Sequence, residues 1–305
     1  MFDRVMSKTD VDVRHHGAPR SYLYVPADQA RLLRSAARSS ADAVILDLED
    51  GVAPRQKDAA RAAALQFLSD NASSRAVWVR INTGRRGAED AAAVLSQGLG
   101  SGGIWVPKAE PSRALDELVA LVAEVAPQVP LGLLIESARG VVTLGQTCAT
   151  PGVDRLQLGE VDLRADLGMP ASYDDGLLDW ARGLVVAHAA SARLRCAVAP
   201  VSVELTDMAS FRALTVRLRE FGFRGRACIH PRQVDVANDI FEVRAEDLAA
   251  AHALLDLFEA QLDRGHGAFR DSEGAMADAA TVRRAREITG RAPGVVRSET
   301  VGEAR

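Results

Sequence analysis

The chain has 305 residues, of which 26% are charged and 48% are hydrophobic, and its formal net charge is -4. These values are ordinary for a soluble globular protein, and they give no electrostatic reason to expect nucleic acid or an anionic membrane as a partner. No run reaches the roughly 18 apolar residues of a spanning helix, and residues 1–19 lack the apolar stretch of a secretory signal. We therefore expect a soluble, cytoplasmic protein that acts on small molecules.

Eight short apolar runs recur along the chain, and a longer segment with helical periodicity follows most of them, for example residues 56–68 and 112–125. This alternation predicts parallel strands joined by helices. The predicted strands are residues 21–24, 43–46, 77–81, 104–106, 131–135, 156–158, 197–203 and 227–229. Eight such units favour a single α/β domain, a (β/α)8 TIM barrel.

The predicted barrel occupies residues 20–243, after an N-terminal extension over residues 1–19. A C-terminal helical extension over residues 244–305 follows it. Within the extension we expect one helix from about 244 to 262, a Gly-rich RGHGAF segment, and a second helix from about 277 to 289. The last fifteen residues are expected to fray.

Polar residues follow most of the predicted strands, where a barrel of this kind places its active site. In chain order they are Asp47, Glu49, Asp50, Arg80, Asn82, Pro107, Lys108, Glu136, Ser137, Glu160, Asp162, His230 and Pro231. Any single one could be only a helix cap, and Asp47 to Asp50 and Ser137 fit that interpretation. Because carboxylates, an arginine and a lysine converge from at least five strands, we expect a polar site at this rim.

Two carboxylates, Glu136 and Asp162, follow the adjacent fifth and sixth strands. Hard oxygen ligands in this number suit Mg²⁺, with Mn²⁺ as the possible substitute, whereas zinc would require His or Cys ligands nearby. The six histidines show no HxxH or HExxH spacing, and the three cysteines are far apart, as expected of reduced thiols. The alternative is that each carboxylate bonds backbone amides or a neighbouring arginine, Arg139 or Arg164.

Two cationic residues are candidates for holding a substrate. Arg80 could clamp a substrate carboxylate with two parallel hydrogen bonds, or it could form a salt bridge with Glu49 or Asp50. Pro107 and Lys108 are assigned to the substrate-binding rim. Lys108 is one of only three lysines and could form a Schiff base, but we favour a rim charge that pairs with a carboxylate.

Ordered motifs over most of the chain resemble those of the HpcH/HpaI aldolase superfamily, in particular its group of citrate lyase β-subunits and malyl-CoA lyases. The motifs are RSYLYVPAD at 20–28, AVILDLEDGVAPRQKDAAR at 43–61, VWVRIN at 77–82, WVPKAE at 105–110, LLIESARG at 133–140, LGEVDLRADLG at 158–168 and CIHPRQV at 228–234. Two segments depart from the family pattern: GEVD stands where GxED is common, and VSVELTD stands where a His-Leu-Asp pattern is common.

The resemblance implies a barrel with a C-terminal helical segment and Mg²⁺ held by Glu136 and Asp162. It makes Arg80 the contact of the substrate carboxylate and places the segment carrying Arg20 near the CoA phosphates. It also implies a homo-oligomer, a trimer or hexamer, in which a neighbouring subunit completes the site. Asp278, in the segment GAFRDSEGAMADAATV, is then the acid/base across the subunit boundary, with Glu49 in reserve.

The function that follows is a magnesium-dependent carbon–carbon lyase. It would cleave a 3-hydroxyacyl-CoA, such as malyl-CoA, citramalyl-CoA or a citryl thioester, into a keto acid and an acyl thioester. In the reverse direction it would form the 3-hydroxyacyl-CoA from these two compounds. One alternative is a metal-dependent aldolase on free keto acids without CoA. The other is a non-catalytic acyl-CoA or organic-acid binding subunit of a larger complex.

Overall fold

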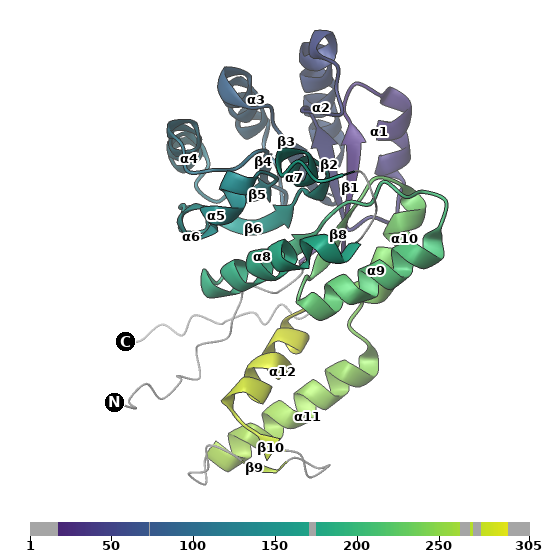
Figure 1. Ribbon diagram of the computed structural model, residues 1–305, viewed down its shortest axis with the longest axis vertical. Helices are drawn as coiled ribbons and strands as arrows, with labels where there is room; N and C mark the ends of the chain where they lie inside the picture. The colour runs from purple at the N-terminus through teal and green to yellow at the C-terminus, as the bar shows by residue number, and fades with distance from the viewer. Residues whose placement is uncertain (1–17, 73, 171–174, 263–268, 271–275, 292–305) are drawn as a thin grey trace, which may run out of the picture. The chain divides into compact units, whose positions relative to one another are not determined.

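The computed structural model describes residues 18–72, 74–170, 175–262, 269–270 and 276–291 (Figure 1). Residues 19–242 form one compact unit, and the described residues from 243 onward belong to a second.

The first unit is a closed barrel of eight parallel strands in sequence order (Figure 1). The strands are β1 (Ser21–Pro26), β2 (Ala43–Asp47), β3 (Ala76–Arg80), β4 (Ile104–Val106), β5 (Leu131–Ile135), β6 (Val153–Leu158), β7 (Cys196–Ala199) and β8 (Gly225–Cys228). The barrel closes at β1, where Tyr22 aligns with Ala43 of β2 on one side and with Ala227 of β8 on the other. The predicted (β/α)8 barrel is confirmed.

Helices connect the strands on the outside of the barrel. They are α1 (Ala30–Ala37), α2 (Lys57–Asn71), α3 (Gly84–Gln97), α4 (Arg113–Val125), α5 (Ala138–Val142), α6 (Leu144–Thr147), α7 (Glu160–Asp166), α8 (Asp179–Ser191), α9 (Met208–Phe221) and α10 (Pro231–Phe241), with two short 3₁₀ turns, η2 (Pro54–Gln56) and η3 (Asp175–Leu178). The predicted seventh strand was too long, since β7 ends at Ala199 and Pro200 follows. Proline has no N–H to donate, so the strand pairing ends there. In the other direction, β6 begins three residues before its predicted start.

Side chains alternate between the two surfaces of the barrel wall, as the period of a strand requires. Val44, Leu46, Val77 and Val79 are fully buried among the surrounding helices and form part of the main hydrophobic core. Burying such side chains contributes roughly 1.5–3 kcal/mol each, and this wall-to-helix layer holds the barrel together.

The barrel interior is closed by aromatic side chains packed around a buried arginine. The ring centroids of Trp78 and Trp105 lie 5.6 Å apart, and the guanidinium of Arg155 lies 4.1 Å from the Trp78 ring centroid. Arg155 Nη1 donates to the hydroxyl of Tyr22 at 2.6 Å. Gly132 makes room for this packing, because a Cβ there would come within 2.4 Å of the Trp105 ring. The interior is therefore filled at this level of the strands.

The second unit supplies the predicted helical C-terminal extension. It contains α11 (Ala245–Leu262), the antiparallel pair β9 (Phe269–Arg270) and β10 (Met276–Ala277), and α12 (Ala279–Arg291). The second helix starts later than predicted, because residues 276–277 pair as a strand. Most of the RGHGAF segment and nearly all of the last fifteen residues lie outside the described residues. No described helix has the length and apolarity needed to cross a membrane.

Candidate active site

The carboxyl-terminal ends of the parallel strands form one rim, and most of the predicted site residues meet there. Asp47 ends β2 and Arg80 ends β3. Lys108 stands two residues after β4, Glu136 follows β5 directly, and Asp162 lies in the first turn of α7, after β6. The rim therefore gathers carboxylates and cations from five successive strands, as the sequence predicted.

Glu136 is a buried carboxylate at the base of this rim, with 3% of its surface exposed. Its Oε1 accepts a hydrogen bond from the backbone N–H of Lys108 at 2.6 Å. Burial raises the pKa of Glu136 to about 8, and the negative charge of Asp162 adds to the rise, while the Lys108 amide and Arg80 oppose it. Gly159 packs against the same side chain, since a Cβ there would meet Glu136 Oε2 at 2.8 Å.

The pair Glu136 and Asp162 has the properties of a site for a hard divalent cation. Neither carboxylate forms an ion pair with a described residue, and Arg139, one of the alternative partners, instead pairs with Glu110 at 3.4 Å. No cluster of three or more His, Cys, Asp or Glu among the described residues could hold a metal. Two carboxylates with no cationic side chain of their own fit Mg²⁺, which usually takes one or two carboxylates and fills its other positions with water or substrate oxygens.

Arg80 is near enough to Glu136 for its charge to lower the pKa of that carboxyl, and it is held in place by carboxylates at and after the end of β2. Its Nε and Nη2 donate to the two oxygens of Asp47 at 2.7 and 2.6 Å, and its Nη1 forms an ion pair with Glu49 at 3.2 Å. Burial works against the charge, but the hydrogen bonds and charge of Asp47 outweigh it and raise the pKa of Arg80. The salt bridge to Glu49 that was weighed as the alternative is therefore present. A guanidinium has five N–H groups, so donors remain for a ligand.

Lys108 joins the two parts of the rim. Its Nζ lies 2.9 Å from Glu49 and 3.3 Å from Asp50, and the hydrogen bond to Glu49 raises the pKa of its ammonium while partial burial opposes this. A protonated, paired amine is not a nucleophile, so the geometry favours the rim charge over the Schiff base. Pro107, which precedes Lys108, is buried.

The structure places Arg20 elsewhere. It precedes β1, at the amino-terminal ends of the strands, and its Nε and Nη2 donate to Asp42 at 2.8 and 3.0 Å. Parallel strands send their first and last residues to opposite ends of a barrel, so Arg20 lies at the end away from the rim, and its role near the CoA phosphates stays a prediction.

Three other predicted residues act as caps in this structure. The carboxylate of Asp278 accepts hydrogen bonds from the backbone N–H groups of Ala280 and Thr281, both at 2.9 Å, at the start of α12. Ser137 caps α5, and His230 Nδ1 accepts from the backbone of Arg232 at the start of α10.

Two contributions to the rim could not be predicted from the sequence. Asp47 is expected at the rim, with a helix cap as the alternative, but its hold on the guanidinium of Arg80 is not predicted; it also accepts from the backbone N–H groups of Glu49 and Gly51 at 2.9 Å each. Gly159 was not singled out, and its closeness to Glu136 depends on the packing of two strands that are separate in sequence. The position of Asp47 at the end of a buried strand, opposite Arg80 in the register, was the available signal.

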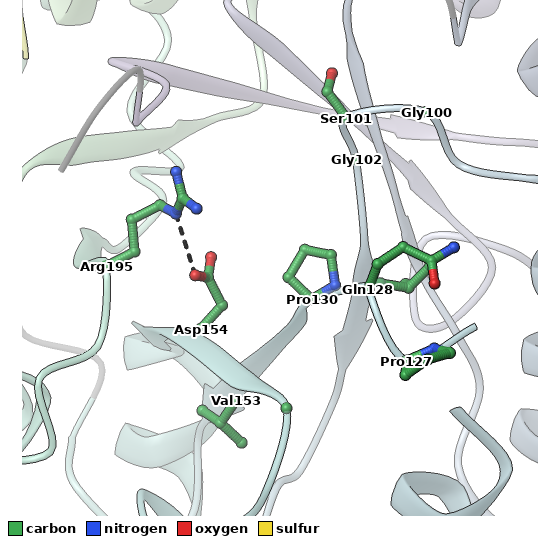
Figure 2. Close-up of a pocket in the computed structure, with 11 residues that line it drawn as sticks. Gly100, Ser101, Gly102, Pro127, Gln128, Pro130, Val153, Asp154 and Arg195 are labelled. Atoms are coloured by element: carbon green, nitrogen blue, oxygen red, sulfur yellow. Dashed lines mark hydrogen bonds and ion pairs between the residues drawn. The ribbon is translucent and has the colours of Figure 1, made fainter. Parts of the chain in front are cut away.

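A hollow of about 380 Å³ lies at the opposite end of the strands, and Figure 2 shows its lining. The residues that line it lie before or at the starts of β4, β5, β6 and β7, and include Ser101, Gln128, Asp154 and Arg195. Arg195 Nε pairs with Asp154 at 3.1 Å. None of the rim residues lines this hollow, so it is separate from the candidate site.

The fold and the rim define a (β/α)8-barrel protein with a polar, carboxylate-rich site at the ends of its strands. The family model for HpcH/HpaI aldolase/citrate lyase matches residues 20–231, and the chain belongs to this family of aldolases and lyases.

Named relatives agree with the family assignment. The chain is 34% identical to a citrate lyase subunit beta-like protein of Deinococcus radiodurans over 88% of this chain and 95% of that protein. It is 32% identical to a (3S)-malyl-CoA thioesterase of Cereibacter sphaeroides over 83% of this chain and 88% of that protein. Among solved structures, it resembles CitE of Mycobacterium tuberculosis in complex with magnesium, acetoacetate and coenzyme A, with a TM-score of 0.67, 30% identity, and 90% of this chain and 97% of that chain covered.

Proposed function

We propose that the protein is a magnesium-dependent carbon–carbon lyase that cleaves or forms a 3-hydroxyacyl-CoA, releasing or taking up a keto acid and an acyl thioester. The observation that carries the proposal is the buried carboxylate of Glu136, whose pKa is raised by burial and by the charge of Asp162, while no cationic side chain of the described residues pairs with either carboxylate. The resemblance to a CitE complex that contains magnesium, acetoacetate and coenzyme A supports the same ligands here.

Each rim residue has a distinct task in this proposal. Glu136 and Asp162 hold Mg²⁺, or Mn²⁺ in its place, and Arg80 uses its remaining N–H groups to orient the carboxylate of the keto-acid half. When bound, the cation supplies Lewis-acid polarisation of the substrate oxygen, on the order of several kcal/mol of stabilisation. Lys108 and Asp47 keep Glu49 and Arg80 in place without meeting the reacting atoms.

Cleavage also needs a base to take the proton of the substrate hydroxyl, and Asp278 is the candidate. Hydrogen bonds from the backbone and side chain of Thr281 hold the pKa of this carboxyl below its usual range, so it is ionised at neutral pH. We propose that Asp278 acts from a neighbouring subunit of a homotrimer or hexamer. Glu49 is the alternative, but Lys108, Arg80 and the Asp50 backbone N–H already occupy its oxygens.

A second candidate is hydrolysis of the thioester itself. The relatives from Cereibacter sphaeroides are named (3S)-malyl-CoA thioesterases and are similar over most of their length. Such an enzyme would take the same 3-hydroxyacyl-CoA but break the carbon–sulfur bond, releasing a hydroxy acid and free CoA. The products therefore separate the two reactions.

The test is to incubate the purified full chain with Mg²⁺ and malyl-CoA, citramalyl-CoA and related thioesters, and to identify the products. A keto acid and an acyl-CoA, lost in Asp162→Ala and with EDTA but retained in the exposed control Glu124→Ala, support the lyase. A hydroxy acid with free CoA supports the thioesterase. If every thioester survives while free oxaloacetate or pyruvate is cleaved or bound with Mg²⁺, the CoA-dependent lyase is refuted.

A further inference from the structure

The first turn of α7 carries two carboxylates, Glu160 and Asp162, that face different parts of the protein. Successive residues of an α-helix are rotated by about 100°, so side chains two positions apart point roughly 200° away from each other. Asp162 lies on the side of Glu136, whose pKa it raises. Glu160 points to the other side, where it meets α8.

Glu160 is bound there by the fully buried guanidinium of Arg182. Nε of Arg182 donates to Glu160 Oε1 at 2.6 Å, and its Nη2 donates to Oε2 at 2.8 Å. Nη1 of the same arginine donates to Asp179 at 2.9 Å, and Asp179 also pairs with Arg217 of α9. The first turn of α7 is thus joined through a chain of ion pairs to two larger helices of the barrel.

This connection acts on the turn of α7 that carries Asp162, whereas Asp166 at the far end of the helix accepts a hydrogen bond from the backbone N–H of Ala138 at 2.7 Å. The helix has only seven residues, and Leu163 is its one fully buried apolar side chain. Two parallel hydrogen bonds between a guanidinium and a carboxylate fix both distance and orientation, which a single apolar contact cannot do. Because Glu160 and Asp162 share one turn of the helix, the bond between Glu160 and Arg182 constrains the direction in which that turn presents Asp162.

We propose that Glu160 and Arg182 form a positioning pair that holds Asp162 in register with Glu136 for cation binding. Glu160 is neither a ligand of the cation nor an acid/base, because both of its oxygens are bound by Arg182 on the far side of the turn. This inference rests on the proposed metal site and adds two residues that orient Asp162 without binding the cation. Partners of this kind orient the groups that bind the metal, and their loss typically weakens metal affinity about 10–100-fold.

The experiment titrates the metal-free full-length protein with Mn²⁺ and follows free Mn²⁺ by electron paramagnetic resonance, with Mg²⁺ calorimetry in parallel. Glu160→Gln keeps the shape of the side chain but loses its charge, and Arg182→Lys keeps the charge but cannot bind both oxygens. The double variant Glu160→Gln/Arg182→Met removes the pair without leaving a buried charge. Val185→Ala is the control, because it weakens the packing of the same helix α8 at a fully buried site and leaves the pair intact.

We expect both single variants and the double variant to bind Mn²⁺ about 10–100-fold more weakly than the wild type, while Val185→Ala binds normally. Saturating Mn²⁺ should then restore most of the activity of Glu160→Gln. If the double variant bound Mn²⁺ as tightly as the wild type, the inference would be overturned, because Asp162 would be oriented correctly without the pair. Complete loss of binding in Glu160→Gln beside normal binding in Arg182→Lys would also overturn it, since this would make Glu160 a ligand. Absence of saturable Mn²⁺ binding in the wild type would instead overturn the proposed function, and the inference with it.

Discussion

Lys108 touches Glu136 with its backbone and turns its side chain away from it. The N–H of Lys108 donates to Glu136 Oε1, while Nζ of the same residue pairs with Glu49. This double contact uses a left-handed backbone conformation, with φ of 49°, which costs a non-glycine residue roughly 1–2 kcal/mol. One residue thereby links the carboxylate proposed to bind the cation to the network that holds Arg80.

Replacing Lys108 should separate its two roles. Lys108→Gly keeps the amide and accepts the positive φ, so we expect it to retain Mg²⁺ affinity. Its KM for the substrate should rise by no more than about fivefold, because a half-exposed ion pair contributes at most about 1 kcal/mol. Lys108→Ala should have the same KM as Lys108→Gly. Its melting temperature should be lower than that of Lys108→Gly, because alanine is strained at the positive φ that glycine accepts. Calorimetry and thermal melts check this, and trapping of a covalent adduct on Lys108 with borohydride would contradict it.

The metal-free protein should lose stability as the pH rises from about 4.5 to about 8. The pKa of Glu136 is near 4.5 when unfolded and about 8 when folded, so in this range the folded state binds a proton that the unfolded state has released. The contribution of Glu136 to the free energy of unfolding is therefore largest below about pH 4.5. It falls by a few kcal/mol, to order of magnitude, as the pH rises through 8. Thermal melts in EDTA should show this slope in the wild type and a flatter one in Glu136→Gln.

Adding a methyl group at Gly159 should disturb the cation site directly. A Cβ there would lie 2.6 Å from Glu136 Cβ, closer than real contacts allow, so Glu136 must move. We expect Gly159→Ala to weaken Mg²⁺ binding about tenfold or more. Gly183→Ala, on the outside of α8 with no atom within 4 Å of the new Cβ, is the matched control. Equal Mg²⁺ affinity in both variants, measured by calorimetry, would show that Glu136 does not hold the cation.

Arg80→Lys should reduce substrate binding more than cation binding. A lysine cannot reproduce the two parallel bonds to Asp47, so its positive charge takes a different position from that of the guanidinium. The substrate carboxylate then loses the oriented N–H donors of Arg80. We expect kcat/KM to fall by roughly 30-fold, or about 2 kcal/mol, with Mg²⁺ affinity little changed. Arg85→Lys, whose side chain is 93% exposed, should be neutral. Steady-state kinetics and calorimetry test the prediction, and an unchanged kcat/KM would remove Arg80 from the substrate site.

The sequence predicted the barrel well because its strands are continuous apolar runs buried on both sides, a pattern that is local in the chain. It predicted the end of β7 poorly, since the alternating run after Pro200 looks like a strand although no described strand pairs with it. A motif match gives the position of Arg20 in the sequence and not its partner, so its pairing with Asp42 at the amino-terminal end of the barrel could not be predicted.

Within the site, the chemical types at the strand ends could be predicted, but their partners could not. Asp47 and Arg80 are 33 residues apart and meet only because β2 and β3 pair in one register. Glu160 and Arg182 meet across two helices whose packing is not encoded in any short motif. Contacts of this kind depend on the whole fold, so the sequence indicated the proposed ligands at the rim without indicating the residues that hold them in place.

The packed layer of Tyr22, Trp78, Trp105 and Arg155 also governs the order of events in the proposed reaction. Because the barrel is filled beneath the rim, substrate and both products must pass through the same opening. In the proposed reaction the keto acid binds at Glu136, which is buried at the base of the rim, so we expect it to bind first in the synthetic direction and to leave last after cleavage. Product-inhibition kinetics should accordingly show a sequential ordered mechanism, in which the thioester leaves before the keto acid.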